Sequence, residues 1–196
     1  ILNTLSTCWW MASGFVVGYS IIALFPTFLQ RDLHLSPGLV ALPIMLQSAL
    51  FFLSSPFWGW MADRIGRRWA MIVPALIGIP CAPLYLLTSN YTMIVVFFGL
   101  QGLFAAGGIY GQNPSYLAER FPTEVRATAA GFCYHQGAIF GGLVGPILAY
   151  LATSLGMGFG VPMLIGTVGG LISFTAALLV GPETRVKQLV AELSVA

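Results

Sequence analysis

Long apolar runs dominate this chain, and short polar segments separate them. A helix needs about 20 residues to cross the ~30 Å apolar core of a bilayer, and six runs are long enough. They cover residues 4–30, 37–60, 69–88, 92–117, 128–153 and 161–181. The runs are apolar on all sides, which favours helices over the short alternating strands of a membrane β-barrel. The pattern predicts an all-α membrane protein, with a six-helix transmembrane bundle over residues 1–182 and a tail over residues 183–196.

The composition fits a protein that is surrounded mainly by lipid. Of the 196 residues, 58% are hydrophobic and only 7% are charged, whereas a soluble domain has roughly 25% charged residues. All the charged residues lie outside the six runs or at their ends. The net charge of +2 gives no indication of nucleic-acid binding.

The distribution of basic residues predicts the orientation of the bundle. Seven of the eight lysines and arginines fall in the second loop, the fourth loop and the tail, and the alternate loops hold only Arg31. Loops rich in Lys and Arg stay on the cytoplasmic side. We therefore expect both termini of this segment to be cytoplasmic, in the cell membrane (the inner or plasma membrane).

Uncharged polar side chains are spread unevenly over the six spans. The third and sixth spans contain no Asn, Gln or His in their interiors. An amide or imidazole that faced lipid would be costly, so the first, second, fourth and fifth spans are expected to line a cavity while the other two lie outside it. The candidate substrate-binding residues are Gln101, Gln47, Tyr19, His135, Tyr134 and Asn113. Hydrogen bonding or packing between helices is the alternative for each of them, and proton handling is a further possibility for His135.

Several kinds of chemistry are missing from the spans. No Asp, Glu, Lys or Arg lies in the middle of a span, so a proton-coupling carboxylate or a fixed charge for an ionic substrate would have to come from outside this chain. The three cysteines lie in apolar runs without metal-ligand spacing and are interpreted as small buried residues. With no nucleophile beside a base and no paired carboxylates, the sequence predicts no enzyme, no cofactor and no metal.

The second loop carries the most specific motif of the chain. It fits G-x-x-x-D-R-x-G-R-R at every fixed position, through Gly59, Asp63, Arg64, Gly66, Arg67 and Arg68. Gly59 permits close helix approach, and Asp63 can face the positive N-terminus of a neighbouring helix. Gly66 allows a tight turn, and the arginines can donate to carboxylates. Topology determination by positive charge is the alternative role of the arginines, but it does not explain Asp63 and the two glycines.

This loop resembles the signature of the major facilitator superfamily, which lies between the second and third helices of each six-helix half. The segment from Tyr116 to Arg126 looks like the loop between helices ten and eleven of sugar porters and related metabolite:proton symporters, and residues 181–184 look like the segment after the last helix. The resemblance covers essentially the whole chain. It implies the C-terminal half of a twelve-helix fold, with an N-terminal six-helix half as partner.

The resemblance also implies roles for individual residues. Asp63, Arg67, Glu119 and Arg126 would belong to a cytoplasmic charge network that holds the outward-open state. The seventh, eighth, tenth and eleventh helices of the family surround the cavity, and they correspond to the four spans that polarity selects.

Two segments are similar to the sialate/lactate:proton symporter group, namely residues 24–29 and residues 119–135. In the monocarboxylate branch of that group, the preceding helix carries a His-x-x-Gln-Asp pattern. Tyr19, Ile22 and Ala23 occupy the corresponding positions here. This difference argues against lactate-type transport and leaves another organic acid or a neutral metabolite.

The residues and the resemblance together predict a secondary transporter that works by alternating access. The expected substrate is a small polar metabolite, in the first place an organic acid, and the expected coupling ion is H⁺. The alternative is a non-transporting six-helix fragment or a membrane scaffold or interaction module.

Overall fold

The structure, a computed structural model, describes residues 2–185. The rest of the predicted tail, including Lys187 and Glu192, lies outside the described residues. The elements in chain order are α1 (Leu2–Ile22), α2 (Phe25–Arg31), α3 (Pro37–Ile65), α4 (Arg67–Leu86), α5 (Tyr91–Gln101), the π-helical segment η1 (Gly102–Ala106), α6 (Gly107–Glu119), α7 (Arg126–Ser154) and α8 (Gly160–Val180). The described part of the chain contains no strand, which confirms the all-α prediction.

These helices form six segments long and apolar enough to span a membrane. The first span differs from the prediction because it is divided into α1 and α2 by a turn at residues 23–24. Pro26 provides the physical reason. A proline ring clashes with the carbonyl four residues earlier, and that residue is Ile22, the last of α1.

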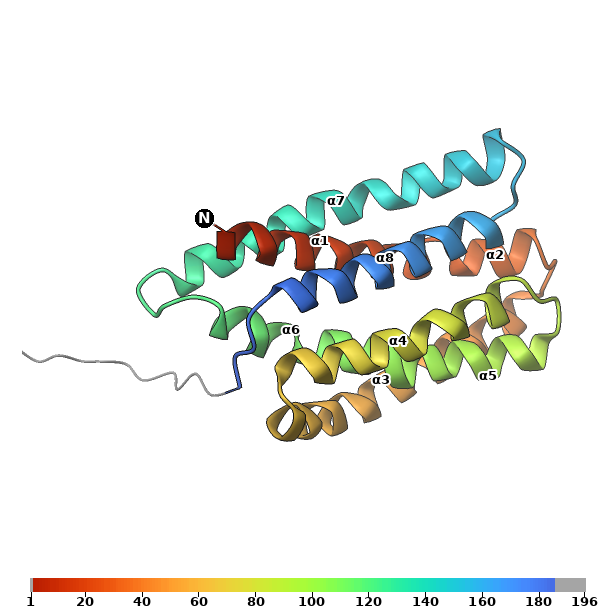
Figure 1. Cartoon of the computed structure of the whole chain (residues 1–196). Coiled ribbons are helices and arrows are strands. Elements are labelled where there is room, and N and C mark those ends of the chain that lie inside the picture. The colour runs from red at the N-terminus through yellow and green to blue at the C-terminus, as the bar shows by residue number, and fades with distance from the viewer. Residues whose placement is uncertain (1, 186–196) are drawn as a thin grey trace, which may run out of the picture.

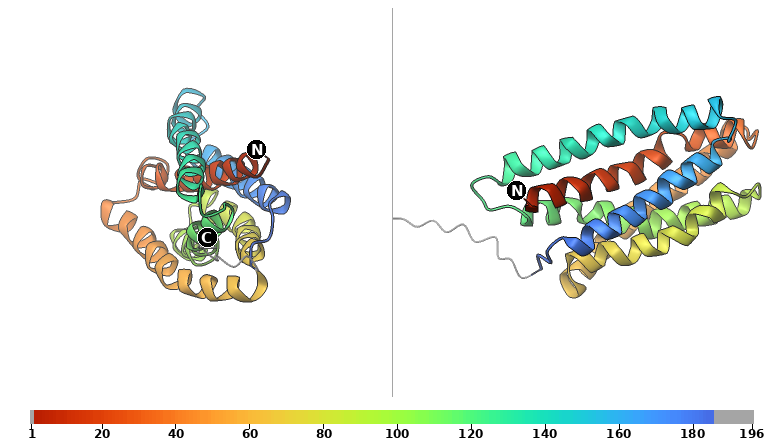
Figure 2. Two further views of the ribbon diagram at one scale, coloured as in Figure 1. Left: turned by 90° about the vertical axis from the view of Figure 1, so that its left-hand side faces the viewer. Right: turned by 45° about the horizontal axis from the view of Figure 1, so that its top comes forward.

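The six spans run side by side along the bundle (Figure 1). The start of α1, the α3–α4 and α6–α7 connections and the end of α8 lie at one end of the bundle, which we name the motif end (left in Figure 1). The other three connections lie at the opposite end, which we name the Asp32 end. Because the number of crossings is even, the start of α1 and the end of α8 lie at the same end of the bundle, as Figure 2 also shows.

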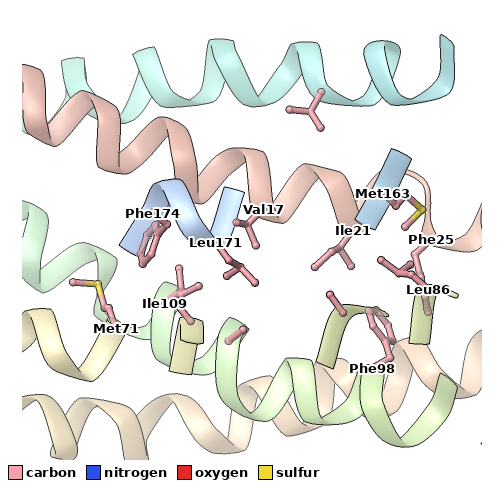
Figure 3. Packing of buried hydrophobic residues seen from close by; sticks show 14 of the residues in the cluster. Val17, Ile21, Phe25, Met71, Leu86, Phe98, Ile109, Met163, Leu171 and Phe174 are labelled. Atoms are coloured by element: carbon pink, nitrogen blue, oxygen red, sulfur yellow. The ribbon is translucent and has the colours of Figure 1, made fainter. Parts of the chain in front are cut away.

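The apolar core lies between α1 and α8 on one side and α4, α5 and α6 on the other (Figure 3). α1 packs most extensively against α7 and α8, and α4 packs against α8. In the most apolar stretch of α4, 56% of the residues are buried, against 17% in α3 and 28% in α7. The third span therefore lies away from lipid more than the sequence suggested, because α8 and α5 cover it. α3 and α7 have the most uncovered surface in this chain.

Candidate functional site

A cavity of about 320 Å³ opens between α1, α2, α3 and the α5–η1–α6 span. Most of its lining is apolar, and aromatic rings form a large part of it. The lining residues include Phe25, Phe51, Phe98, Gln47, Gln101 and Tyr110. None of the described residues that line the cavity is charged. A cavity of this kind can hold a small molecule by apolar contact and by a few oriented polar groups.

Gln101 is the most buried polar side chain of the cavity. It is only 2% exposed, and within residues 2–185 its Oε1 atom has no hydrogen-bond partner. A buried polar atom without a partner costs free energy. Gln47 lines the same cavity from α3, where its Oε1 atom is 3.5 Å from the hydroxyl of Ser48. The structure thus brings two of the six candidate residues to one cavity.

Tyr110 is a cavity residue that sequence reasoning did not select. Its hydroxyl donates a hydrogen bond of 2.9 Å to the carbonyl of Gly14, which connects α6 to α1. The sequence offered only a weak indication that Tyr110 lines a cavity, because a tyrosine in a membrane helix can equally be a packing residue. The hydrogen bond orients the ring at the cavity wall.

Three other candidates lie together at a different place, on the contact between α1 and α7. Phe15 is the centre of this aromatic cluster, with its ring centroid 5.0 Å from that of Tyr134 and 6.1 Å from that of Tyr19. The Tyr134 and His135 rings are 5.7 Å apart. Tyr19, Tyr134 and His135 are exposed in this chain, and none of them lines the cavity described above.

Asn113 also lies outside the cavity lining. It is half-buried in α6, and among the described residues its Oδ1 atom has no hydrogen-bond partner. The neighbouring Gln112 is almost fully buried. Its Nε2 atom lies 3.7 Å from the position that a Cβ would occupy at Gly59, so it faces the motif on α3.

The motif end holds an ion-pair network centred on Arg67. Its Nη1 atom is 2.8 Å from Asp63 Oδ1, and its Nε atom is 3.1 Å from Glu119 Oε1. The Glu119 side chain is 10% exposed, whereas that of Asp63 is 67% exposed. The second oxygen of Glu119 accepts a hydrogen bond from the hydroxyl of Thr184. Three elements meet here: the start of α4, the end of α6 and the segment after α8.

Glu183 is a third carboxylate at this end, beside Asp63 and Glu119, and it was not among the candidates. Its oxygens accept the backbone N–H groups of Arg67 and Arg68 at 2.8 and 3.2 Å, so it caps the N-terminus of α4. The sequence argument gave a helix N-terminus to Asp63, but the carboxylate that lies there is Glu183. Gly66 makes the approach possible, because its φ is +100° and a Cβ there would be 2.6 Å from Glu183 Oε2.

The other basic residues of the two loops have separate roles. Arg64 lies over the ring of Trp60 at 3.9 Å, and Arg68 donates to the carbonyl of Leu179 at 3.1 Å. Among the described residues, no ion pair joins Arg126 to Glu119. The Nε atom of Arg126 donates to the carbonyl of Ala118 at 3.0 Å, in the last turn of α6.

Arg120 was used in the sequence only to predict orientation, yet it is almost fully buried. Its Nε atom donates to Asn3 Oδ1 and its Nη1 atom to the Tyr116 hydroxyl, both at 2.9 Å. Its Nη2 atom donates to Ser6 Oγ. The guanidinium therefore ties the start of α1 to the end of α6 through neutral acceptors, and no sequence pattern of a single loop could reveal that.

The comparison with protein families decides the classification. Residues 9–193 match the model of the Major Facilitator Superfamily. This chain belongs to that superfamily. The match confirms the resemblance that the Gly59–Arg68 motif indicated, and the six spans correspond to one half of the twelve-helix major facilitator fold.

Individual superfamily members are similar over much of this chain. The inner membrane metabolite transport protein YhjE of Escherichia coli is 36% identical over 150 residues, which is 74% of this chain and 33% of that protein. The cis,cis-muconate transport protein of Acinetobacter baylyi is 29% identical over 77% of this chain and 37% of its own length. The sialic acid transporter NanX of E. coli is 33% identical over 64% of this chain and 30% of its own length.

This superfamily member spans about a third of the length of the curated relatives that it matches. The relatives are transporters by name, which confirms the prediction that the chain is not an enzyme. The six apolar spans and the family together make it an integral membrane protein.

Proposed function

We propose that this chain provides one half of the substrate pathway of a proton-coupled symporter, which moves a small organic acid across the inner membrane by alternating access. The observation that carries the proposal is the cavity among α1, α3 and the fourth span, which the neutral side chains of Gln101 and Gln47 help to line. An amide side chain that lines a mostly apolar cavity is suited to exchange hydrogen bonds with a ligand.

The charge distribution supports different roles in substrate binding for the two six-helix halves. A small organic acid needs a cation or several donors for its carboxylate, but none of the described residues that line the cavity is charged. Gln47, Gln101 and Tyr110 offer neutral polar groups, and Phe25 and Phe98 offer apolar surface. We therefore propose that this half binds the uncharged part of the substrate, and that an N-terminal six-helix half supplies the partner of the carboxylate and the proton-coupling group.

The names of the relatives support an organic acid as substrate, because two of them are named for transport of cis,cis-muconate and of sialic acid. The motif-end network supports alternating access, since it joins three elements that would have to separate if this end opened. Its position in a loop rich in arginine supports a cytoplasmic placement of this end.

Uptake into proteoliposomes by the full-length protein tests the proposal. We expect uptake of radiolabelled cis,cis-muconate or sialic acid to exceed that of glucose and to increase when a proton gradient is applied. No uptake of either acid would contradict the assigned substrate class, and uptake that is independent of the gradient would contradict symport.

Gln101→Leu tests the cavity itself. The change removes an unpartnered buried oxygen, so the melting temperature should not fall, whereas uptake should fall about tenfold or more because a hydrogen bond to the substrate is lost. Gln136→Leu on α7, which is outside the cavity lining, is the matched control. His135→Ala tests whether the aromatic cluster, rather than the cavity, is needed for uptake. Equal uptake in all three variants and in the unchanged protein would refute the cavity assignment.

A further inference from the structure

The fourth span contains an irregularity at the place where it meets the cavity. In η1 the N–H of Gly107 donates to the carbonyl of Gly102, five residues earlier, instead of four as in an α-helix. Such a turn holds one more residue than an α-helical turn. Compared with a regular α-helix, all residues beyond this turn are therefore rotated back about the helix axis by about 100°, the angle of one residue.

This rotation determines which residues of the span face the cavity. Gln101 and Tyr110 are nine residues apart, so in a regular α-helix they would be about 180° apart, on opposite faces. With the π turn between them, the separation falls to about 80°. Ile109 moves to within about 20° of Gln101 by the same count. All three residues line the cavity in the structure, which agrees with the rotated register.

The π turn is held against α3 at both of its ends. Gly102 lies so close to α3 that a Cβ would be 2.5 Å from the carbonyl oxygen of Gln47. Gly107 lies against Ser54, and a Cβ there would be 3.3 Å from Trp58 Cδ1. Any larger side chain at these two positions would separate η1 from α3.

Trp58 makes the one side-chain hydrogen bond to this turn among the described residues. It is 5% exposed, and its Nε1–H donates to the carbonyl of Leu103 at 3.1 Å. Phe104 packs near its ring, with the centroids 6.4 Å apart. A wide turn leaves a backbone carbonyl poorly paired along the helix axis, and a buried carbonyl needs a donor.

We propose that Trp58 is a positioning residue that holds the π turn through the Leu103 carbonyl, and thereby keeps Gln101 and Tyr110 on the same face of the cavity. The residue does not touch the substrate. Its effect on transport rests on the proposed function, whereas its effect on the helix register does not.

The register is tested without any substrate. In the full-length protein, with Cys8, Cys81 and Cys133 changed to Ala, a Tyr110→Cys variant reports access from the cavity to a water-soluble maleimide. We expect Trp58→Phe, which keeps an aromatic ring of smaller size and removes the N–H, to slow labelling about fivefold, as for one lost hydrogen bond. Trp69→Phe, on the exposed side of α4, should leave the rate unchanged. An unchanged rate in Trp58→Phe would overturn the proposal.

Deletion of Leu103 distinguishes positioning from packing. The deletion removes the additional residue, so a regular α-helix would then keep the ~80° separation between Gln101 and Tyr110. Trp58→Phe should slow labelling in the unchanged chain and have no effect in the deletion background. An equal effect in both backgrounds would show that Trp58 only fills space. If the deletion variant does not fold, the labelling rates of the single variants still decide the proposal.

The transport arm uses cis,cis-muconate as the probe. We expect Trp58→Phe to increase KM about fivefold with kcat unchanged, because the cavity residues are displaced while the moving parts are intact. A fall in kcat alone would contradict a positioning role. If the unchanged protein transports no organic acid, the proposed function fails, but the labelling result still stands as the test of Trp58.

Discussion

The cavity and the motif end differ in whether their buried polar groups have partners. At the motif end, Arg67 pairs with Glu119, and Glu183 accepts the first backbone N–H groups of α4 through short contacts between distant segments. In the cavity, the buried oxygen of Gln101 is left without a partner among the described residues. The first arrangement stabilises one arrangement of the helices. Under the proposed function the second region binds the substrate, so stability and recognition would depend on separate regions of the bundle.

The largest expected effect comes from breaking the ion-pair network. Arg67→Gln leaves the nearly buried carboxylate of Glu119 without its cation, which should reduce the free energy of unfolding by about 3 kcal/mol. The exposed pair with Asp63 adds little. Thermal unfolding in detergent measures the change. Arg64→Gln, an exposed arginine in the same loop, is the control and should have an effect below about 0.5 kcal/mol.

A smaller effect is expected from the turn that brings Glu183 to α4. Gly66→Ala forces a side chain into the positive-φ region and against the Glu183 carboxylate, at a cost of about 1–3 kcal/mol. Gly169→Ala on α8 is the control, because a Cβ there meets open space and alanine favours the helix. Equal melting temperatures for the two variants would show that the Gly66 geometry is not required.

The smallest effect is expected in the cavity wall. Tyr110→Phe removes the hydrogen bond to the Gly14 carbonyl and should reduce the free energy of unfolding by about 1 kcal/mol or less, since that carbonyl is in a helix. KM for the organic acid should rise several-fold at the same time. A loss of stability comparable to that of Arg67→Gln would contradict the separation of the two regions.

The six spans could be predicted from the sequence because burial in lipid is a property of composition and length. The break after Ile22 could not be singled out, because Pro26 is one of several prolines inside apolar runs that could each kink a helix. The π turn could not be predicted either: residues 102–106 are apolar or glycine on every side, so no periodicity reveals how far the helix turns there. Its position depends on the close contacts that Gly102 and Gly107 make with α3 and on the hydrogen bond from Trp58.

The sequence could predict which types of residue belong to the candidate site, but not which face of each helix these residues occupy. The cost of an amide in lipid selected Gln47 and Gln101, which lie on one cavity. The same rule selected Tyr19 and His135, which lie on another contact, because it says only that a group avoids lipid. The role of Glu183 as a helix cap could not be predicted, because it arises from the approach of segments that are 116 residues apart in the chain.

The cap that Glu183 places on α4 has a consequence for biosynthesis. The first amides of α4 are synthesised long before residue 183 leaves the ribosome, so the N–H donors at residues 67 and 68 would be hydrated at the membrane surface until then. Closure of this end is then a late event that follows insertion of α8, and a chain truncated before residue 183 would insert all six helices without completing it.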